Sequence, residues 1–519
     1  MTDPAGATAP TPGSGEPREA RGVFSNASLN LVASLLPLPL ALVTVPAVIR
    51  GFGVDRYGVL ATAGVVLAYL ALLDVGLGRA STRFLARSLG EGAATTADTF
   101  WTVALLAAAI GVAGGLGILA AAGPLVRHVL RVPEALAGDA AAAFRALALA
   151  APFVVVLPAL LGALEARRRF DLVAAISVPT AALGLLAPLA VLPWTTSLLP
   201  VVVAIAVVQA AACAVTLAVC RRAVPGIGAP ARPRLRVVRE LLGYGRWVAV
   251  SNVVGPLMVN ADRLVIGAVL SVRDVGFYAA PYDLVTRLSL VPSSVMRALF
   301  PLFSADRTAD VREARRLAVD GARAVALVMG PLAVAIVALA PDLLRLWLGA
   351  EFAERSHATL QLLAVGVTVN ALAMVPFWLL QGIGRPDVCA KFHLLELALY
   401  VPLLLLLLRW QGITGAALAW TLRVTLDGGL LLAASHRLVG AAEHLGSVRR
   451  LARYGALLAV ALGAAWLDAA GGAGAAARLA GAVLLAAATF GVGWFVLLGA
   501  GERASVASAV AARVRGGSR

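Results

Sequence analysis

Residues 246–303 read RWVAVSNVVGPLMVNADRLVIGAVLSVRDVGFYAAPYDLVTRLSLVPSSVMRALFPLF. This stretch contains two apolar segments long enough to span a membrane, and inside them lie Asp262, Arg263, Asp283 and Arg287. A charge in the middle of a bilayer costs about 2.5 to 3.5 kcal/mol, so such residues usually face a protein-lined cavity or pair with one another. We therefore expect a membrane protein that has a polar interior.

The composition of the whole chain agrees with this class. Of the 519 residues, 60% are hydrophobic and only 14% are charged, and the mean hydropathy is +0.89. The net charge of +16 could indicate nucleic acid, but nucleic-acid binding needs exposed basic faces, whereas these basic residues form short clusters between apolar segments. The sequence therefore predicts no nucleic-acid partner.

Fourteen windows between residues 28 and 499 have the roughly 20 apolar residues that about 30 Å of hydrocarbon requires. The sequence thus predicts an all-α polytopic membrane protein with about 14 transmembrane helices. Most of the basic residues fall in cytoplasmic segments if the N-terminus is cytoplasmic, which is the orientation that the positive-inside rule favours. An even number of helices then places the C-terminus in the cytoplasm as well.

Segments rich in Pro, Gly and Arg divide the predicted helices into groups. The stretch RRAVPGIGAPARPRLRVVRELLGYGR (221–246) lies between two sets of six helices, which indicates a linker. The first residues are rich in Pro, Gly and Ala without an apolar core, which indicates a disordered tail rather than a signal peptide. The predicted units are a cytoplasmic tail at 1–22, an N-lobe at 23–222, a linker at 223–245, a C-lobe at 246–440, two further helices at 441–500 and a cytoplasmic tail at 501–519.

Cysteine and histidine spacing gives no sign of a disulfide framework or a metal centre. Cys213, Cys220 and Cys389 are an odd number, and the five histidines are scattered along the chain. We therefore expect no metal, no cofactor and no catalytic residue.

An internal duplication relates the two predicted lobes. The segment VDRYGVLATA (54–63) resembles VRDVGFYAAP (272–281) at an offset of 218, and at the same offset LEARRR meets GIGRPD with Arg167 over Arg385. Two anchors that agree on one offset indicate a repeat. Because the offset spans an even number of helices, the lobes share one orientation. A pseudo-two-fold axis along the membrane normal is expected to relate them, with the site between the lobes.

The duplication also predicts where the ionic residues lie. At the offset of 218, Arg297 falls over Arg79. The six other candidate residues, Asp262, Arg263, Asp283, Arg287, Arg423 and Asp427, fall over Thr44, Val45, Val65, Tyr69, Ile205 and Gln209. None of these six first-lobe residues is charged. The sequence therefore predicts one charged cavity wall, contributed by the second lobe, and a nearly neutral opposite wall.

Two pairs of opposite charges have helical spacing. Asp283 and Arg287 are four residues apart, as are Arg423 and Asp427, so each pair occupies one helical face. One interpretation is that both are structural intrahelical ion pairs. The other is that they line a cavity and meet an ionic head group. Because Arg binds phosphate oxygens bidentately, a pyrophosphate is the expected guest of Arg263, Arg287 and Arg423.

The buried acidic residues have two interpretations as well. Asp262 and Arg263 are adjacent and lie about 100° apart around their helix, so at most one of them points directly at a cavity. Asp262 is either a paired carboxylate or a proton or sodium site, and Glu396 offers the same alternatives. Together with Asp283 and Asp427, these residues are the acidic set considered for ion coupling.

A cytoplasmic basic segment follows the second predicted helix. In LLDVGLGRASTRFLARSLG (72–90), Gly76 and Gly78 allow close helix approach, and Arg79 and Arg83 follow on an amphipathic turn. One interpretation is an interfacial helix that binds anionic lipid. The alternative is that Arg79 and Arg83 capture a phosphorylated lipid substrate at the cytoplasmic mouth.

Two segments, 52–87 and 244–304, resemble the polysaccharide-transport and O-antigen (lipid-linked oligosaccharide) flippase family of the multidrug/oligosaccharidyl-lipid/polysaccharide (MOP) flippase superfamily. The resemblance covers about residues 23–440. Its most specific parts are Asp74 with Gly76 and Arg83, Asp262 with Arg263, Gly276 with Tyr278, and Phe300 with Pro301. It implies a flippase that moves polyprenyl-pyrophosphate-linked glycans from the cytoplasmic to the outer leaflet by alternating access of two six-helix lobes.

The resemblance also implies a cationic cavity, which Arg263, Arg287 and Arg423 would supply here. It implies a location in the cytoplasmic membrane of a bacterium. The implied partners are the lipid-linked glycan, membrane lipids, and glycosyltransferases or a polymerase of the same pathway.

Two other functions compete with this one. A proton- or sodium-coupled multidrug or toxin exporter of the same superfamily is expected to have fewer cavity arginines, more acidic residues and twelve helices, so the predicted fourteen favour the flippase. A membrane enzyme of polysaccharide assembly is expected to carry catalytic residues on a long outer loop, and the predicted outer loops are short. We therefore expect a transporter rather than an enzyme.

Overall fold

The computed structural model describes residues 37–72, 77–88, 93–227, 234, 237–239, 258, 260–304, 311–439, 445–471, 474–504 and 508. Helices make up nearly all of this part of the chain, and it contains no strand. The prediction of an all-α membrane protein is confirmed. The predicted tail at 1–22, most of the linker at 223–245 and most of the tail at 501–519 lie outside the described residues, so those boundaries remain predictions.

The first lobe contains seven described α-helices and one π-helical turn. They are α2 (Pro37–Phe52), α3 (Val54–Leu72), α4 (Leu77–Ser88), α5 (Ala93–Pro124), η1 (Leu125–Val129), α6 (Glu134–Ala166), α7 (Phe170–Val191) and α8 (Leu198–Ala223). The second lobe contains a helical segment at 260–269 followed by α10 (Val272–Thr286), η2 (Arg287–Ser289), α11 (Leu290–Ser304), α12 (Val311–Leu348), α13 (Ala350–Gly382) and α14 (Pro386–Val439). Then come α15 (Leu445–Ala470) and α16 (Ala475–Leu497).

Among the described residues, ten helices are long and apolar enough to cross a membrane. The longest, α14, holds two predicted spans, because Gln411 and Gly412 interrupt its helical geometry and Gly412 has a φ of +57°. The second of the two apolar segments in residues 246–303 is two helices, since the 3₁₀ turn η2 separates α10 from α11. The first of these segments lies partly outside the described residues. The multi-pass architecture is therefore established, whereas the count of fourteen remains a prediction.

The helix bounds repeat between the lobes. Val54 and Val272 begin α3 and α10 at an offset of 218, as the sequence predicts. From α6 onward the offset is 216. Gly349 alone joins α12 to α13, whereas the four residues 130–133 join η1 to α6, and α12 ends one residue later than the offset of 218 predicts, so the net change is two residues. Phe170 and the start of α14 keep this shorter offset, and so do the ends of α8 and α14. The two lobes therefore share one helical plan with a single change of register.

The change of register corrects the second predicted anchor of the repeat. Arg169 bonds Asp171, and Arg385 bonds Asp387, with an Nε–Oδ1 distance of 2.9 Å in both cases. Each pair lies where one long helix ends and the next begins. The equivalent of Arg385 is therefore Arg169 and not Arg167. With this correction, residues 423 and 427 lie over apolar residues 207 and 211, so the prediction that the ionic residues belong to the second lobe is unaffected.

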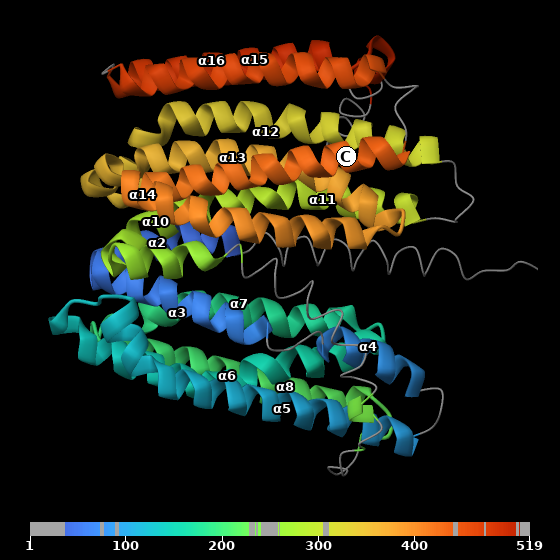
Figure 1. Cartoon of the computed structure of the whole chain (residues 1–519). Coiled ribbons are helices and arrows are strands. Elements are labelled where there is room, and N and C mark those ends of the chain that lie inside the picture. Colours follow the sequence, from blue (N-terminus) through green and yellow to red (C-terminus); the bar gives the residue numbers. More distant parts are fainter. Residues whose placement is uncertain are drawn as a thin grey trace, which may run out of the picture.

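The helices lie side by side in two groups (Figure 1). α5, α6 and α8 pack together on one side, and α12, α13 and α14 pack together on the other, with α3 and α10 in contact between them. The α15–α16 hairpin packs against α12 at the far edge of the second lobe. There Tyr454 lies against Gly330 and Gly493, where any larger residue would meet its ring.

Two glycines bring the lobes together at one end of the bundle. A Cβ atom on Gly58 of α3 would overlap the carbonyl oxygen of Val272, and one on Gly276 of α10 would lie 2.9 Å from the carbonyl oxygen of Val54. These contacts are equivalent under the offset of 218, as expected for helices that cross on a pseudo-two-fold axis. The predicted topology assigns this end to the outer face, and we call it the outer end.

Candidate functional site

A cavity of about 380 Å³ lies among the second-lobe helices. Its lining residues are Asn260, Arg263, Tyr282, Asp283, Thr286, Ser289, Val367, Asn370, Trp420 and Arg423. All of them come from the second lobe, whereas the sequence predicted a site between the lobes. α3 and α10 meet closely at Gly58 and Gly276, and Asp283 lies two helical turns beyond Gly276 on α10. Tyr57 of α3 still interacts electrostatically with Asp283, Arg263 and Arg287.

One side of the cavity carries an ion pair between two helical segments. Arg263, on the segment at 260–269, donates a hydrogen bond to the carboxylate of Asp283 on α10. The guanidinium also lies 5.3 Å from the ring centroid of Tyr282, within the range of a cation–π contact. Sequence spacing offered Arg287 as the partner of Asp283. The structure shows Asp283 paired with Arg263, and it places Arg287 at the first position of η2.

The other side of the cavity carries a second ion pair, on α14. Arg423 Nη1 lies 3.5 Å from Glu396 Oε2, and the guanidinium lies 5.6 Å from the ring centroid of Tyr400. The Arg423 side chain is 9% exposed and that of Glu396 is fully buried. Sequence spacing offered Asp427 as the partner of Arg423. Because α14 folds back at its interruption, Glu396 from its first half reaches the arginine of its second half.

Asp262 is a buried carboxylate that two tyrosines satisfy. It is 1% exposed and accepts hydrogen bonds from the hydroxyl of Tyr278, at 2.8 Å, and from the hydroxyl of Tyr400. Its neighbour Arg263 lines the cavity and Asp262 does not. This agrees with the expectation that at most one of the two residues faces the cavity.

Next to Arg423 lies a cluster of His393, Glu396 and Asp427. One potential ligand atom from each lies within 4.8 Å of the other two. Oε1 of Glu396 and Oδ1 of Asp427 are buried and have no hydrogen-bond partner. Two adjacent carboxylates with buried, unsatisfied oxygens are costly unless a proton or a cation lies between them. This arrangement can therefore take up one positive charge.

Comparison with known proteins gives the context of this site. A family model described as "Polysaccharide biosynthesis protein" matches residues 50–357, which is more than half of the chain. The chain belongs to this polysaccharide biosynthesis family. A relative named "Putative O-antigen transporter", from Shigella flexneri, is 25% identical over 411 residues, covering 79% of this chain and 96% of the relative.

Solved structures show the fold of this member of the family. The lipid II flippase MurJ, in an inward closed conformation, matches with a TM-score of 0.67 at 11% identity, covering 91% of this chain and 98% of its own. An inward-facing multidrug resistance MATE family transporter of the MOP superfamily matches with a TM-score of 0.66 at 16% identity, covering 79% of this chain and 98% of its own. The fold is thus that of the MOP transporters.

Two of the predicted residues come from the first lobe. Arg79 and Arg83 are on α4, which is held to α6 by a hydrogen bond from Ser81 Oγ to the carbonyl of Ala159 at 2.7 Å. Their side chains lie outside the part of the chain that the structure describes. Their role at a cytoplasmic mouth remains a prediction.

The structure adds site residues that sequence reasoning did not select. Tyr278 and Tyr282 are four residues apart on α10, and Tyr400 is four residues after Glu396. Such spacing places each pair on one helical face beside the predicted charges. His393 is three residues before Glu396, so helical spacing also predicts that their side chains are neighbours.

Proposed function

We propose that this protein is a flippase of the bacterial cytoplasmic membrane. It moves a polyprenyl-pyrophosphate-linked oligosaccharide or polysaccharide precursor from the cytoplasmic to the outer leaflet by alternating access of its two lobes. The observation that carries the proposal is the convergence of Arg263 and Arg423 on one membrane-embedded cavity. The family match, the O-antigen transporter relative and the fold shared with a lipid II flippase support it.

The two arginines suit a diphosphate because each is held in place by a carboxylate and still lines the cavity. Arg263 is bound by Asp283 and Arg423 by Glu396, so both guanidinium groups are fixed in position and still border the cavity. Phosphate oxygens compete with the carboxylates for the N–H donors, and such contacts are stronger in a dry cavity than in water. Arg287, at the bend between α10 and α11, is the third proposed phosphate contact.

Entry of the substrate is proposed to begin at α4. Arg79 and Arg83 would meet the pyrophosphate at the cytoplasmic mouth while the prenyl chain stays in lipid. Outward movement of an anion also gains from a membrane potential that is negative inside, by about 2.3 kcal/mol per charge for each 100 mV. Glycosyltransferases or a polymerase of the same pathway are the proposed partners, because the substrate must be made on one side and used on the other.

The acidic residues have three proposed roles. Glu396 and Asp427 are the proposed coupling site, because one buried oxygen of each, Oε1 of Glu396 and Oδ1 of Asp427, lacks a donor and a proton or sodium ion would satisfy them. Asp283 is proposed to release Arg263 to the substrate. Asp262 is already satisfied by Tyr278 and Tyr400, which favours a paired carboxylate over an ion site.

The same cluster favours one alternative function. A cation-coupled multidrug exporter would also use a buried acidic site, and the MATE transporter shares the fold at a similar TM-score. The two arginines on the cavity wall favour an anionic substrate instead. Export of cationic dyes from cells that carry this protein, at a rate unchanged by Arg423→Gln, would favour the exporter.

The test of the flippase is translocation of a lipid-linked glycan in reconstituted liposomes. Wild type, Arg263→Gln and Arg423→Gln are compared, with Arg437→Gln as the matched control because Arg437 is an exposed arginine of the same helix. Loss of one charged hydrogen bond predicts at least about a tenfold fall for the two cavity variants and none for the control. Equal rates in all four proteins, with intact folding, would refute the site, and no transport of any lipid-linked glycan would refute the function.

A further inference from the structure

The duplicated motif at the outer end carries inverted charges. The first lobe reads VDRYG at 54–58 and the second reads VRDVG at 272–276, and both lie at the start of equivalent helices. Asp55 therefore corresponds to Arg273, and Arg56 to Asp274. Outside these two positions the motifs keep the same valine and the same glycine. The inversion needs a physical explanation.

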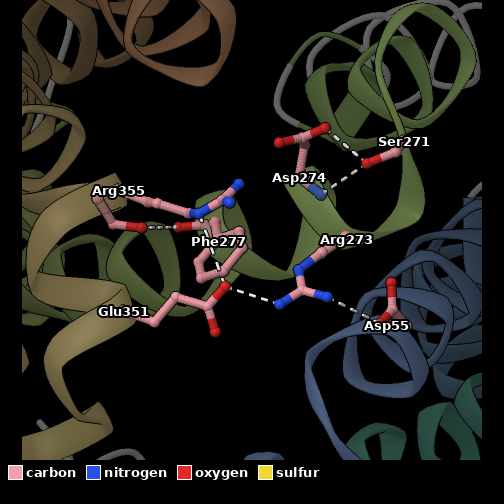
Figure 2. Close-up of polar contacts among 8 residues, drawn as sticks. Asp55, Ser271, Arg273, Asp274, Phe277, Glu351 and Arg355 are labelled. Atoms are coloured by element: carbon pink, nitrogen blue, oxygen red, sulfur yellow. Dashed lines mark hydrogen bonds and ion pairs between the residues drawn. The ribbon is translucent and has the colours of Figure 1, made fainter.

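The close contact of Gly58 and Gly276 supplies that explanation. Equivalent residues face each other where two helices cross on a two-fold axis, so identical residues there would place like charges opposite each other. With the charge reversed in one lobe, the residue at this position attracts its counterpart in the other lobe. The structure shows this attraction: Nη1 of Arg273 lies 3.5 Å from Oδ2 of Asp55 in the other lobe (Figure 2).

Arg273 has a second, closer partner in its own lobe. Its Nη2 donates to Oε1 of Glu351 at 2.7 Å, and Glu351 also lies 3.6 Å from Nε of Arg355 on the same helix. Both guanidinium groups lie near the ring of Phe277, at 5.9 and 5.2 Å from its centroid. Figure 2 shows Arg273 between Glu351 and Asp55, reaching both. Arg273 is therefore fixed by the second lobe and extends to the first.

The other inverted position has a different use. The carboxylate of Asp274 accepts a hydrogen bond from the hydroxyl of Ser271, and the backbone N–H of Asp274 donates to the same hydroxyl at 3.1 Å. This arrangement caps the start of α10. Asp274 is thus engaged within its own helix, which leaves the Asp55–Arg273 pair as the bond between lobes that the inverted motif supplies.

A neutral hydrogen bond joins the lobes as well. Pro46 has no backbone N–H, so the carbonyl of Leu42, four residues earlier on α2, has no helical donor. Nε1 of Trp347, on α12 of the second lobe, donates to that carbonyl at 2.8 Å. The contact between the lobes therefore includes an ion pair, which salt screens, and a neutral hydrogen bond, which salt does not screen.

We propose that Asp55 and Arg273 form an outer latch that biases the transporter toward the state closed at the outer end. When the lobes separate there, Arg273 stays with Glu351 and only the longer contact, to Asp55, breaks. The side chains of this pair are 39% and 44% exposed. An exposed pair of this kind shifts a population by at most about fivefold, so the latch tunes the equilibrium and does not lock it.

The test measures distance across the outer end without any substrate, so it stands apart from the proposed function. Spin labels are placed at exposed Glu134 on α6 and Glu354 on α13 of the full chain in liposomes, with the native cysteines replaced. Asp55→Asn and Arg273→Gln are each expected to raise the long-distance population up to about fivefold at low salt, and the double variant to match either single one. At 1 M salt we expect wild type, the two single variants and the double variant to have the same distance distribution.

Matched controls separate the latch from a general charge effect. Arg355→Gln removes the same charge from the same surface but breaks only a contact within one lobe, so the distance distribution is expected to stay unchanged. Effects of Asp55→Asn and Arg273→Gln that simply add in the double variant would overturn the latch. So would a distribution that neither variant shifts, or a shift in Arg355→Gln equal to that in Arg273→Gln.

Discussion

The hydroxyl of Tyr400 donates a hydrogen bond to Asp262, which is 138 residues away in the sequence. The same ring lies beneath the guanidinium of Arg423, so one tyrosine contacts both the satisfied carboxylate and the cavity arginine. Tyr400→Phe keeps the ring and removes the hydroxyl. We expect it to destabilise the protein by about 1 to 3 kcal/mol, because Asp262 is left with one hydroxyl donor in a buried site.

Thermal unfolding of the purified protein measures that loss. Tyr278→Phe, which removes the other donor, is expected to have a similar effect. Tyr454→Phe is the control, because its hydroxyl makes only a 3.3 Å bond to a backbone carbonyl. Equal melting temperatures for all three variants and wild type would contradict the importance of the Asp262 bonds.

Glu396→Gln tests the proposed coupling site. The amide keeps the shape of the side chain but takes up no proton, and without the negative charge it binds a cation more weakly than the carboxylate does. We expect transport in liposomes to lose most of its dependence on an imposed proton or sodium gradient, while transport driven by the membrane potential remains. Asp427→Asn should act in the same way, since both carboxylates border the same unsatisfied space. A variant that keeps the full gradient dependence would exclude the cluster from coupling.

Gly58→Ala tests the crossing of α3 and α10. The added methyl would overlap the carbonyl oxygen of Val272, so the helices must move apart. We expect a cost of about 1 to 3 kcal/mol in unfolding free energy, as for other overpacked contacts. Gly276→Ala should cost less, because its Cβ would lie 2.9 Å from the nearest atoms. Gly64→Ala on the same helix meets nothing within 4 Å and serves as the control.

The exposed turns between long helices give a prediction of no effect. Arg169 with Asp171 and Arg385 with Asp387 form equivalent ion pairs on the surface. The bond to Asp387 raises the pKa of the Arg385 guanidinium, which is charged at any working pH in either case. We expect Arg385→Gln to leave the melting temperature and transport unchanged at physiological salt, since solvent and ions screen such pairs. A clear loss in either measurement would give these turns a role that the structure does not show.

The sequence predicted the helices well because apolar length is a property of each segment alone. It also predicted that Arg263 and Arg423 would share one region, since ionic residues in a membrane seek one another. One of its two interpretations offered intrahelical partners for Asp283 and Arg423, and the structure shows partners from other helical segments. Spacing of four residues describes one helix, whereas the pairs with Asp283 and Glu396 depend on how neighbouring helices are placed along each other.

The repeat shows the same limit. The motif at residues 54–58 set the offset correctly, because glycine and valine there are fixed by a close helix crossing. The second anchor missed by two residues, because the connection at Gly349 is three residues shorter than its counterpart in the first lobe and the helix before it is one residue longer. A matching arginine in a cytoplasmic turn is weak evidence where several arginines stand in a row. Only the observed helix ends decide among them.

The inverted pair of Asp55 and Arg273 has a consequence for how such a protein can be assembled. A symmetric dimer of two identical first lobes would bring one Asp55 against another, and the two subunits would repel each other at their point of closest approach. Joining the lobes in one chain allows each copy to change separately, so that a position on the axis can differ in sign from its own counterpart. Covalent linkage thus permits an attraction that exact symmetry forbids.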